Sequence, residues 1–319
     1  MEISVTVEAM FGLSWSLWKQ LIEKIEKMGF AGLYRSDHFM IGKPGTDSLE
    51  LITSLTYLAE HSQRLHFGSL VSPLSFHHPS MLARQAMSLN ELSAGRMILG
   101  LGAGWHTEEH TMFGFQLGDK KTRLDRLEEG LQVITSLVHS PEPVTFDGKF
   151  FQLHDAILVP QSPVRIMVGG NGPTRTLPLV ARYADIWNCQ VAEPLAFKEV
   201  NSRLDRLIVE AGRQPEEVKR TMMVPVLCQR TEQDIQRHIS MIQKYAAPFR
   251  DASAEEIKAW LYDLKGIIGS PQQIVDGLSA YAENGAEEIM LEWFGLYDLE
   301  GLDLLGSEVL PHFLKRRLA

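Results

Sequence analysis

The chain has 319 residues, of which 45% are hydrophobic and 22% are charged. These proportions are typical of a folded globular protein and exclude a disordered or fibrous class. Thirty-one basic residues against 40 acidic ones give a formal net charge of −9, so we expect neither nucleic acid nor an acidic membrane surface as a partner.

The N-terminus and the two cysteines indicate the cell compartment. The first ten residues, MEISVTVEAM, contain no basic segment of the kind that opens a signal peptide. No apolar stretch of the chain is long enough to span a bilayer. Cys189 and Cys228 lie far apart in apolar runs, and we expect two buried, reduced thiols rather than a disulfide or a metal pair. These features predict a cytoplasmic protein.

Short apolar or β-branched runs alternate with longer amphipathic segments along nearly the whole chain. Strands are expected at residues 3–7, 32–35, 65–71, 97–102, 165–169, 185–189, 221–228 and 288–293. Helices, in which apolar residues recur three and four positions apart, are expected at 17–28, 48–61, 80–92, 123–139, 175–184, 197–211, 233–245 and 271–284. Gly29, Gly212 and Gly285 stand where a glycine commonly follows a helix, and Ser270 with Pro271 opens another helix.

Eight strands that alternate with eight helices predict an α/β fold with a parallel sheet and helical crossovers. Because an open doubly wound sheet usually has fewer strands, we expect closure into a TIM-like (β/α)8 barrel with insertion segments. Residues 141–163 are expected to form a short strand pair that turns at Asp147-Gly148, and residues 246–265 an excursion with its own short helix. No change in composition marks a linker, so residues 1–319 are expected to form a single domain with these two insertions.

Polar residues follow the second strand in the sequence RSDHF at 35–39. Barrel enzymes place their working residues at this end of the strands. Asp37 and His38 could have separate roles there, one binding a ligand and the other transferring protons near neutral pH. Taken alone, the pair fits a helix-capping aspartate and a surface histidine equally well. His77 and His78 are interpreted as a polar loop before a helix.

A glycine-rich segment, GLGAGW at 100–105, follows the fourth strand. It is not the dinucleotide fingerprint G-x-G-x-x-G, which requires glycine or alanine where Trp105 stands. Its glycines indicate either a backbone that approaches a ligand closely or simply a tight loop.

The next five residues, HTEEH at 106–110, match the zinc-peptidase pattern H-x-x-E-H. A zinc site needs both histidines on one helix face and a further ligand downstream. Since the motif directly follows the glycine-rich loop, we assign no metal ligand here and keep zinc hydrolysis only as an alternative from another class.

A second glycine-rich turn follows the fifth strand and leads into a helix. Glycine-rich backbone at a helix N-terminus is suited to bind an anion such as phosphate. An ordinary strand-to-helix loop is the simpler alternative, but the clustering favours phosphate. The turn comprises Val168, Gly169, Gly170, Asn171, Gly172, Pro173 and Thr174.

Taken in order, these motifs resemble the luciferase-like monooxygenase superfamily, and specifically its coenzyme F420-dependent oxidoreductase branch. The resemblance runs through GFAGLYRSDHF at 29–39, the segment at 65–114 that ends in GLGAGWHTEEHTMFG, and VGGNGPTRTLPLVARYADIWN at 168–188. It implies a TIM-like barrel with insertions, a flavin or deazaflavin bound at the C-terminal rim, and a homodimer.

The resemblance also implies roles for individual residues. His38 resembles the histidine beside the ring that is the candidate catalytic acid or base, and Asp37 the residue that contacts the ring system. Ser69-Leu70 matches the place of a non-prolyl cis peptide whose bulge backs the ring. The loop that lines the cofactor site corresponds to Ala103, Gly104 and Trp105, with Glu109 further along. The turn from Gly169 to Thr174 matches the phosphate-binding turn.

We therefore expect hydride transfer between coenzyme F420 and a small organic substrate whose identity the sequence does not give. One alternative keeps the fold but uses FMN, molecular oxygen and a partner flavin reductase. The zinc hydrolase is a further alternative. A barrel that binds a ligand without catalysing a reaction is another, because a fold alone does not determine activity.

Overall fold

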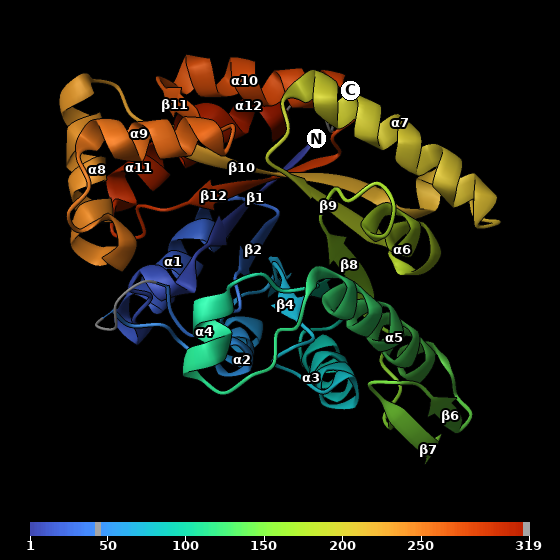
Figure 1. Cartoon of the computed structure of the whole chain (residues 1–319). Coiled ribbons are helices and arrows are strands. Elements are labelled where there is room, and N and C mark those ends of the chain that lie inside the picture. Colours follow the sequence, from blue (N-terminus) through green and yellow to red (C-terminus); the bar gives the residue numbers. More distant parts are fainter. Residues whose placement is uncertain (42–45, 315–319) are drawn as a thin grey trace.

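The computed structural model describes residues 1–41 and 46–314, and within them eight parallel strands close into a barrel with helices around its outside (Figure 1). The barrel strands, in spatial order, are β1 (Glu2–Val7), β2 (Gly32–Arg35), β3 (His66–Ser69), β5 (Met97–Gly102), β8 (Arg165–Gly169), β9 (Ile186–Gln190), β10 (Lys219–Cys228) and β12 (Glu288–Trp293). Each pairs with the next, and β12 pairs in parallel with β1, which closes the ring. The predicted TIM-like (β/α)8 fold is confirmed.

Eight helices correspond to the eight predicted from periodicity. They are α1 (Trp15–Met28), α2 (Leu51–His61), α3 (Pro79–Leu92), α5 (Lys120–His139), α6 (Thr176–Tyr183), α7 (Pro194–Glu210), α8 (Glu232–Tyr245) and α10 (Pro271–Glu283). Their ends follow the expected chemistry. Gly29, Gly212 and Gly285 have φ of 96°, 78° and 97°, the left-handed region that glycine adopts freely. Ser270 caps α10 by accepting from the amide of Gln273.

Shorter elements complete the described chain. They are α4 (Thr107–Met112), α9 (Ala254–Asp263), α11 (Leu299–Leu304), α12 (Leu310–Leu314), the 3₁₀ helices η1 (Ala9–Phe11), η2 (Pro215–Glu217) and η3 (Ala247–Phe249), and the π-helix η4 (Leu305–Val309). The strand pair predicted within residues 141–163 is present, since β6 (Val144–Asp147) pairs antiparallel with β7 (Gln152–Ala156). The short helix predicted within residues 246–265 is α9, which follows η3. Two short strands, β4 (Ser72–Pro73) and β11 (Ile267–Gly269), extend the sheet beside β5 and β10.

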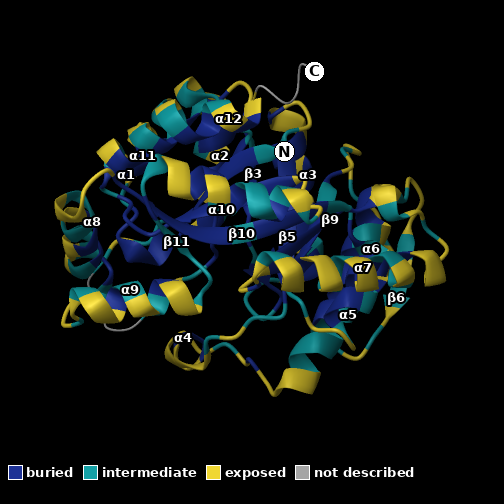
Figure 2. Ribbon diagram, turned by 90° about the horizontal axis from the view of Figure 1, so that it is seen from above, coloured by how far each residue is buried: buried dark blue, intermediate teal, exposed yellow. Residues whose placement is uncertain are grey.

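The core has two parts, because a strand of a parallel barrel is covered on both faces. Side chains that alternate with those facing the helices meet inside the barrel; they are Tyr34, Leu70, Ile98, Met167, Ile186 and Met290. A larger cluster fills the space between strands and helices, and Figure 2 shows buried strands inside a layer of helices with exposed outer faces. In the described segments, no helix combines the length and apolar character needed to cross a membrane.

The predicted position of the cis peptide was wrong by one residue. The bond between Ser69 and Leu70 was expected to be cis, whereas the non-prolyl cis bond joins Leu70 and Val71. Ser69 is still part of β3, where it pairs with Arg35, and the amide of Leu70 donates to the carbonyl of Arg35 at 2.8 Å. The hydrogen-bond ladder therefore continues one residue further than expected before the strand bulges.

Candidate active site

A cavity of about 620 Å³ opens where the carboxyl ends of the barrel strands meet. Its wall includes residues that follow β1, β2, β5, β9 and β12, and the penultimate residue of β12. This volume lies in the range usual for small-molecule and cofactor sites, about 300–1,000 Å³. The end of the barrel that carries the cavity is the one at which barrel enzymes place their active sites.

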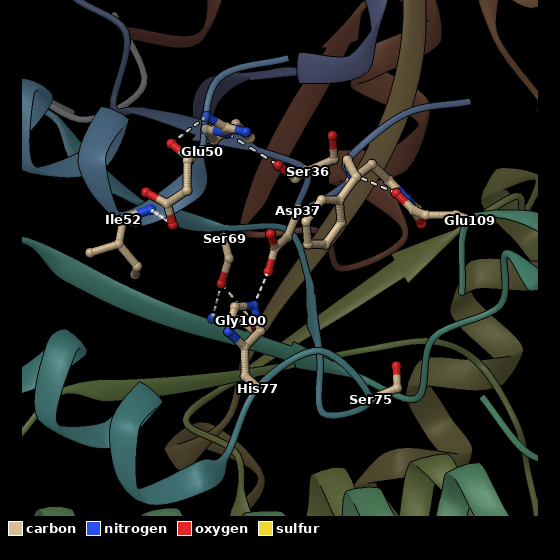
Figure 3. A network of polar contacts seen from close by, with 12 residues as sticks. Ser36, Asp37, Glu50, Ile52, Ser69, Ser75, His77, Gly100 and Glu109 are labelled. Atoms are coloured by element: carbon tan, nitrogen blue, oxygen red, sulfur yellow. Dashed lines mark hydrogen bonds and ion pairs between the residues drawn. The ribbon is translucent and has the colours of Figure 1, made fainter. Parts of the chain in front are cut away.

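The loop after β2 is held in place by a buried arginine. The guanidinium of Arg35 donates to the carbonyls of Ser36, Leu49 and Glu50, and to the hydroxyl of Ser54 at 2.5 Å. Its complete burial lowers the pKa of Arg35 to about 10, so the group stays charged at neutral pH. Four bonds from one side chain fix the backbone from which the next residues project. Two of the acceptor residues, Ser36 and Glu50, are labelled in Figure 3.

Asp37 lies beside this anchor and forms an ion pair with His77. The Nε2 atom of His77 lies 2.6 Å from Oδ2 of Asp37, and Figure 3 shows the contact. Burial disfavours charge on both groups, but the hydrogen bond and mutual attraction outweigh it: they lower the pKa of Asp37 and raise that of His77. Asp37 supports the wall of the cavity from behind, since it is not one of the lining residues.

His38 lines the cavity and is paired with Glu109. Its Nδ1 lies 2.9 Å from Oε2 of Glu109, whose other oxygen accepts from the amides of Phe39 at 2.5 Å and Met40 at 3.2 Å. Burial opposes the charge of His38, but the bond to Glu109 and the charges of Glu8 and Glu109 raise its pKa. Burial likewise opposes the charge of Glu109, but His38 and the two amides lower its pKa. The pair therefore favours a protonated imidazole beside a carboxylate.

The loop after β5 forms another part of the wall. Gly104 has a φ of 76° and its carbonyl accepts from Arg123 at 2.8 Å. Trp105 is 59% exposed although it lines the cavity, and its ring lies edge-on 5.7 Å from that of His38. Ala103 is half-buried and not a lining residue. A large ring left this exposed at a cavity is available for contact with a ligand.

The glycines before this loop allow β5 to pack closely against the neighbouring bulge, and they are not needed to let a ligand approach the backbone. A Cβ on Gly100 would lie 2.0 Å from the carbonyl oxygen of Ser69, and one on Gly102 would lie 2.4 Å from a methyl group of Val71. The hydroxyl of Ser69 completes the contact by donating to the carbonyl of Gly100 at 2.8 Å. The residues of the bulge, with Leu70 and Val71 in the cavity wall, can lie this close only because β5 lacks side chains there.

Two side chains of HTEEH, those of Glu109 and His110, have partners other than a metal. His110 contacts the hydroxyl of Ser75 through Nε2 at 2.7 Å and the carbonyl of His106 through Nδ1 at 2.7 Å. Glu109 is bonded to His38 and to two amides. Within the described ranges, no group of three or more His, Cys, Asp or Glu side chains is arranged to hold a metal ion. Both cysteines are free and buried.

The glycine-rich turn after β8 lies beside the cavity without lining it. Asn171 contacts Gln190, which does line it, through its side-chain amide at 2.5 Å. The amide of Gly170 donates to the carbonyl of Asn188, whereas the amides of Asn171, Gly172 and Thr174 have no acceptor among the described residues. Helix α6 begins just after them, at Thr176. Three free amides before a helix are consistent with an anion site.

Sequence reasoning missed two carboxyl groups in the cavity wall. Glu8 follows β1 and Glu292 is the penultimate residue of β12; both are more than 90% buried. Each is a single charge at the C-terminal end of an apolar strand, which could have identified them. His77 was expected to lie in a polar loop without a defined partner, and its bond to Asp37 was also missed, because the two residues are 40 positions apart.

Comparison with known proteins extends this description. Residues 12–288 match the family model described as luciferase-like monooxygenase. The chain is 25% identical over 318 residues to an F420-dependent glucose-6-phosphate dehydrogenase of Microbacterium testaceum, with 91% of each protein covered. It is 35% identical over 145 residues to a 4-hydroxyprotoasukamycin monooxygenase of Streptomyces nodosus subsp. asukaensis, covering 45% of this chain and 38% of that protein.

Among solved structures, an F420-dependent secondary alcohol dehydrogenase in complex with an F420-acetone adduct superposes with a TM-score of 0.78. The superposition covers 97% of this chain and 98% of that one, at 18% sequence identity. At that identity the likeness concerns the fold.

Proposed function

Because this chain belongs to the luciferase-like monooxygenase family, we propose that it transfers hydride between coenzyme F420 and a small organic substrate bound in the cavity. It is an oxidoreductase. The proposal rests chiefly on one observation, the His38–Glu109 pair in the cavity wall. When bound, a deazaflavin supplies the two-electron chemistry. The protein then has to bind both partners, exclude water and move a proton.

We assign the transfer of the proton to His38. Since its Nδ1 is directed at Glu109, the neutral ring keeps its hydrogen on Nδ1 and presents a lone pair on Nε2. Among the described residues nothing bonds Nε2. Removal of hydride from an alcohol carbon also releases the hydroxyl proton, which Nε2 accepts; in the reverse direction the imidazolium donates it to the carbonyl oxygen. Glu109 stabilises the imidazolium that holds this proton.

The wall of the cavity fits a planar ring system. Leu70 and Val71 present an apolar surface, and Trp105 presents an exposed ring near His38. The buried Nδ1 of His106, which has no hydrogen-bond partner in the described chain, adds a polar atom to the same wall. We assign Leu70, Gly104 and Trp105 to the ring. Asp37, Ser69, Ala103 and Glu109 support that surface from behind or beside it.

The phosphate of the cofactor is assigned to the turn from Val168 to Thr174. The free amides of Asn171, Gly172 and Thr174 support this assignment, as does the start of α6 behind them. The turn is beside Gln190, which lines the cavity.

F420 is favoured over FMN because a relative that aligns along 91% of both proteins is F420-dependent. The alternative is an FMN-dependent monooxygenase that uses molecular oxygen and a partner flavin reductase. It is supported by the higher identity, 35%, to a monooxygenase over a shorter segment. We further propose that residues 1–319 form one domain that works as a homodimer in the cytoplasm, where the two free thiols would stay reduced.

Two substitutions test the assignment of roles. His38→Ala should slow hydride transfer about 10²–10⁴-fold, the usual contribution of general acid–base catalysis, and leave F420 affinity nearly unchanged. Asp37→Ala should weaken F420 binding more than it slows the chemical step. Single-turnover rates at saturating cofactor, beside binding titrations, separate the two effects. A wild-type rate in His38→Ala with the best alcohol of a panel would reduce His38 to a wall residue.

A further inference from the structure

The cavity wall carries two buried acids that form no ion pair with a basic side chain of the described residues. Glu8 is 7% exposed and Glu292 is 6% exposed, and both line the cavity. Their carboxyl groups hydrogen-bond to each other. No other described group forms a hydrogen bond or ion pair with either carboxyl. A hydrogen bond between two carboxyls needs a proton, and burial favours that proton on Glu292.

The strand pattern explains how the two acids come together. Side chains two residues apart in a strand point to the same side. Glu292 therefore points into the barrel like Met290 below it, which belongs to the interior cluster. Thr6 is in register with Glu292, and Glu8 is two positions after Thr6, just beyond the end of β1. Burial, together with the charge and hydrogen bond of Glu8, raises the pKa of Glu292 well above its usual value.

At the other end of β12, a buried acid is paired with a basic side chain, as is usual. Glu288 is 2% exposed, and Lys219 at the base of the barrel contacts it at 2.6 Å. At the cavity end, the corresponding positions of β10 are Met223 and Pro225, which are uncharged. No lysine or arginine among the described residues lines the cavity. A buried charge without a partner is unfavourable, so a ligand that brings the missing positive charge gains from pairing with it.

The other cationic side chains near the cavity are hydrogen-bonded to groups other than the two acids. Arg35 is influenced by the charge of Glu8, but its bonds go to carbonyls of its own loop and to Ser54. The charge of Glu8 also contributes to the raised pKa of His38, but the imidazole is hydrogen-bonded to Glu109 and not to Glu8. Neither supplies the acid pair with a direct partner.

Aromatic rings line the same cavity as the acid pair. Phe11 follows Glu8 by three residues and Phe294 follows Glu292 by two, and the two ring centroids are 5.7 Å apart. Trp260 lies 4.6 Å from Phe294, and Phe249 lies 4.5 Å from Trp260. All four rings line the cavity. The faces of aromatic rings attract cations, Trp most strongly, so rings and acids favour the same kind of ligand.

We propose that Glu8 and Glu292, with the four aromatic rings beside them, form a subsite for a positively charged nitrogen of the substrate. The inference rests on the proposed function, which places the substrate in this cavity. It makes the substrate an organic amine or quaternary ammonium compound that also carries the reacting alcohol or carbonyl group. A phosphate ester or carboxylate would meet the unpaired charge of the acid pair and be rejected.

Choline and 3,3-dimethylbutan-1-ol test the subsite because they have the same shape and differ in charge. Isothermal titration of the purified protein at pH 7.5 should give choline a Kd at least about tenfold lower, equivalent to about 1.4 kcal/mol. The double substitution Glu8→Gln/Glu292→Gln should abolish this preference. Trp260→Leu should reduce it, and Glu142→Gln, which changes an exposed glutamate, should leave it intact.

The same proteins are titrated with F420 to separate the two proposals. Unchanged F420 binding by the double variant, together with the lost preference, supports the subsite. Equal affinity of the wild type for the two probes, a comparison that needs no variant, would overturn the subsite. A preference that persists in the double variant would overturn it too. Failure of the wild type to bind F420 would instead contradict the proposed function and leave the choline result standing.

Discussion

Replacing Glu109 with glutamine changes which nitrogen of His38 carries the proton and leaves the volume of the side chain at position 109 almost unchanged. The Glu109 side chain is fully buried and receives three hydrogen bonds, from His38, Phe39 and Met40. One oxygen of the new amide can still accept from the two backbone amides. Its nitrogen, however, donates where the carboxylate accepted, so the neutral His38 ring would have to carry its hydrogen on Nε2.

The size of the effect follows from the 2.9 Å contact. An opposite charge at this distance shifts a pKa by about 1–3 units. Glu109→Gln should therefore lower the pKa of His38, and it removes a hydrogen bond to a charged partner, which is worth about 1.5–3 kcal/mol. The reversed tautomer also removes the free lone pair on Nε2, so hydride transfer from an alcohol should slow as strongly as in His38→Ala.

The pH dependence of stability has a defined sign. The raised pKa of His38 contributes stability that is complete below the unfolded value, about 6.5, and is lost as the pH rises through the folded value. The lowered pKa of Glu109 contributes stability above about 4.3 that is lost as the pH falls through its folded value. The difference in unfolding free energy between wild type and Glu109→Gln should be largest near pH 5–6 and smaller at pH 9.

Histidine NMR titration gives the pKa of His38, and urea unfolding at pH 5.5 and 9 gives the stability difference. Glu108→Gln is the matched control, because Glu108 is the exposed neighbour of Glu109 in the first turn of α4. An unchanged His38 pKa in Glu109→Gln, or a stability loss that is the same at both pH values, would refute the ion-pair description.

Three further outcomes are expected. Gly100→Ala should lower the unfolding free energy by about 1–3 kcal/mol in urea titrations, because its Cβ meets a backbone oxygen, and Gly102→Ala, which meets a side-chain methyl, should lower it less. The carboxylate of Asp298 is 1% exposed and accepts hydrogen bonds from His238, Gln229 and Gly301, so Asp298→Ala should lower the unfolding free energy by about 3–5 kcal/mol at pH 7. Burial opposes the charge of Asp298, but His238 outweighs it and lowers the pKa of Asp298. The loss should therefore become smaller towards pH 3 in the same titrations. Trp105→Ala should weaken cofactor binding in a titration and leave the melting temperature nearly unchanged, since the ring is 59% exposed.

The barrel could be predicted because its signal is local. Each barrel strand is a short apolar run, and each large helix shows apolar residues at helical spacing, so all sixteen elements are found near their predicted positions. The C-terminal elements α11, η4 and α12 were missed, since they are short and irregular in period. The bulge after β3 was located to within one residue, because the ladder from Arg35 to Leu70 depends on a neighbouring strand that periodicity does not describe.

The candidate site was predictable where a motif is continuous in sequence. His38 and Glu109 were both identified, but their contact joins residues 71 positions apart and emerges only from the closed barrel. Glu8 and Glu292 are separated by nearly the whole chain and meet only because β12 pairs with β1. The glycines at 100 and 102 could be explained only when the strand that packs on them was known.

Titration of the purified protein with F420 and with FMN, side by side, tests the central proposal most directly. We expect F420 to bind one site per chain, to bind more tightly than FMN, and to change the fluorescence of the protein through Trp105, with the fluorescence change lost in Trp105→Ala. Tight binding of FMN with no binding of F420 would contradict the proposed cofactor and favour the flavin-dependent monooxygenase instead.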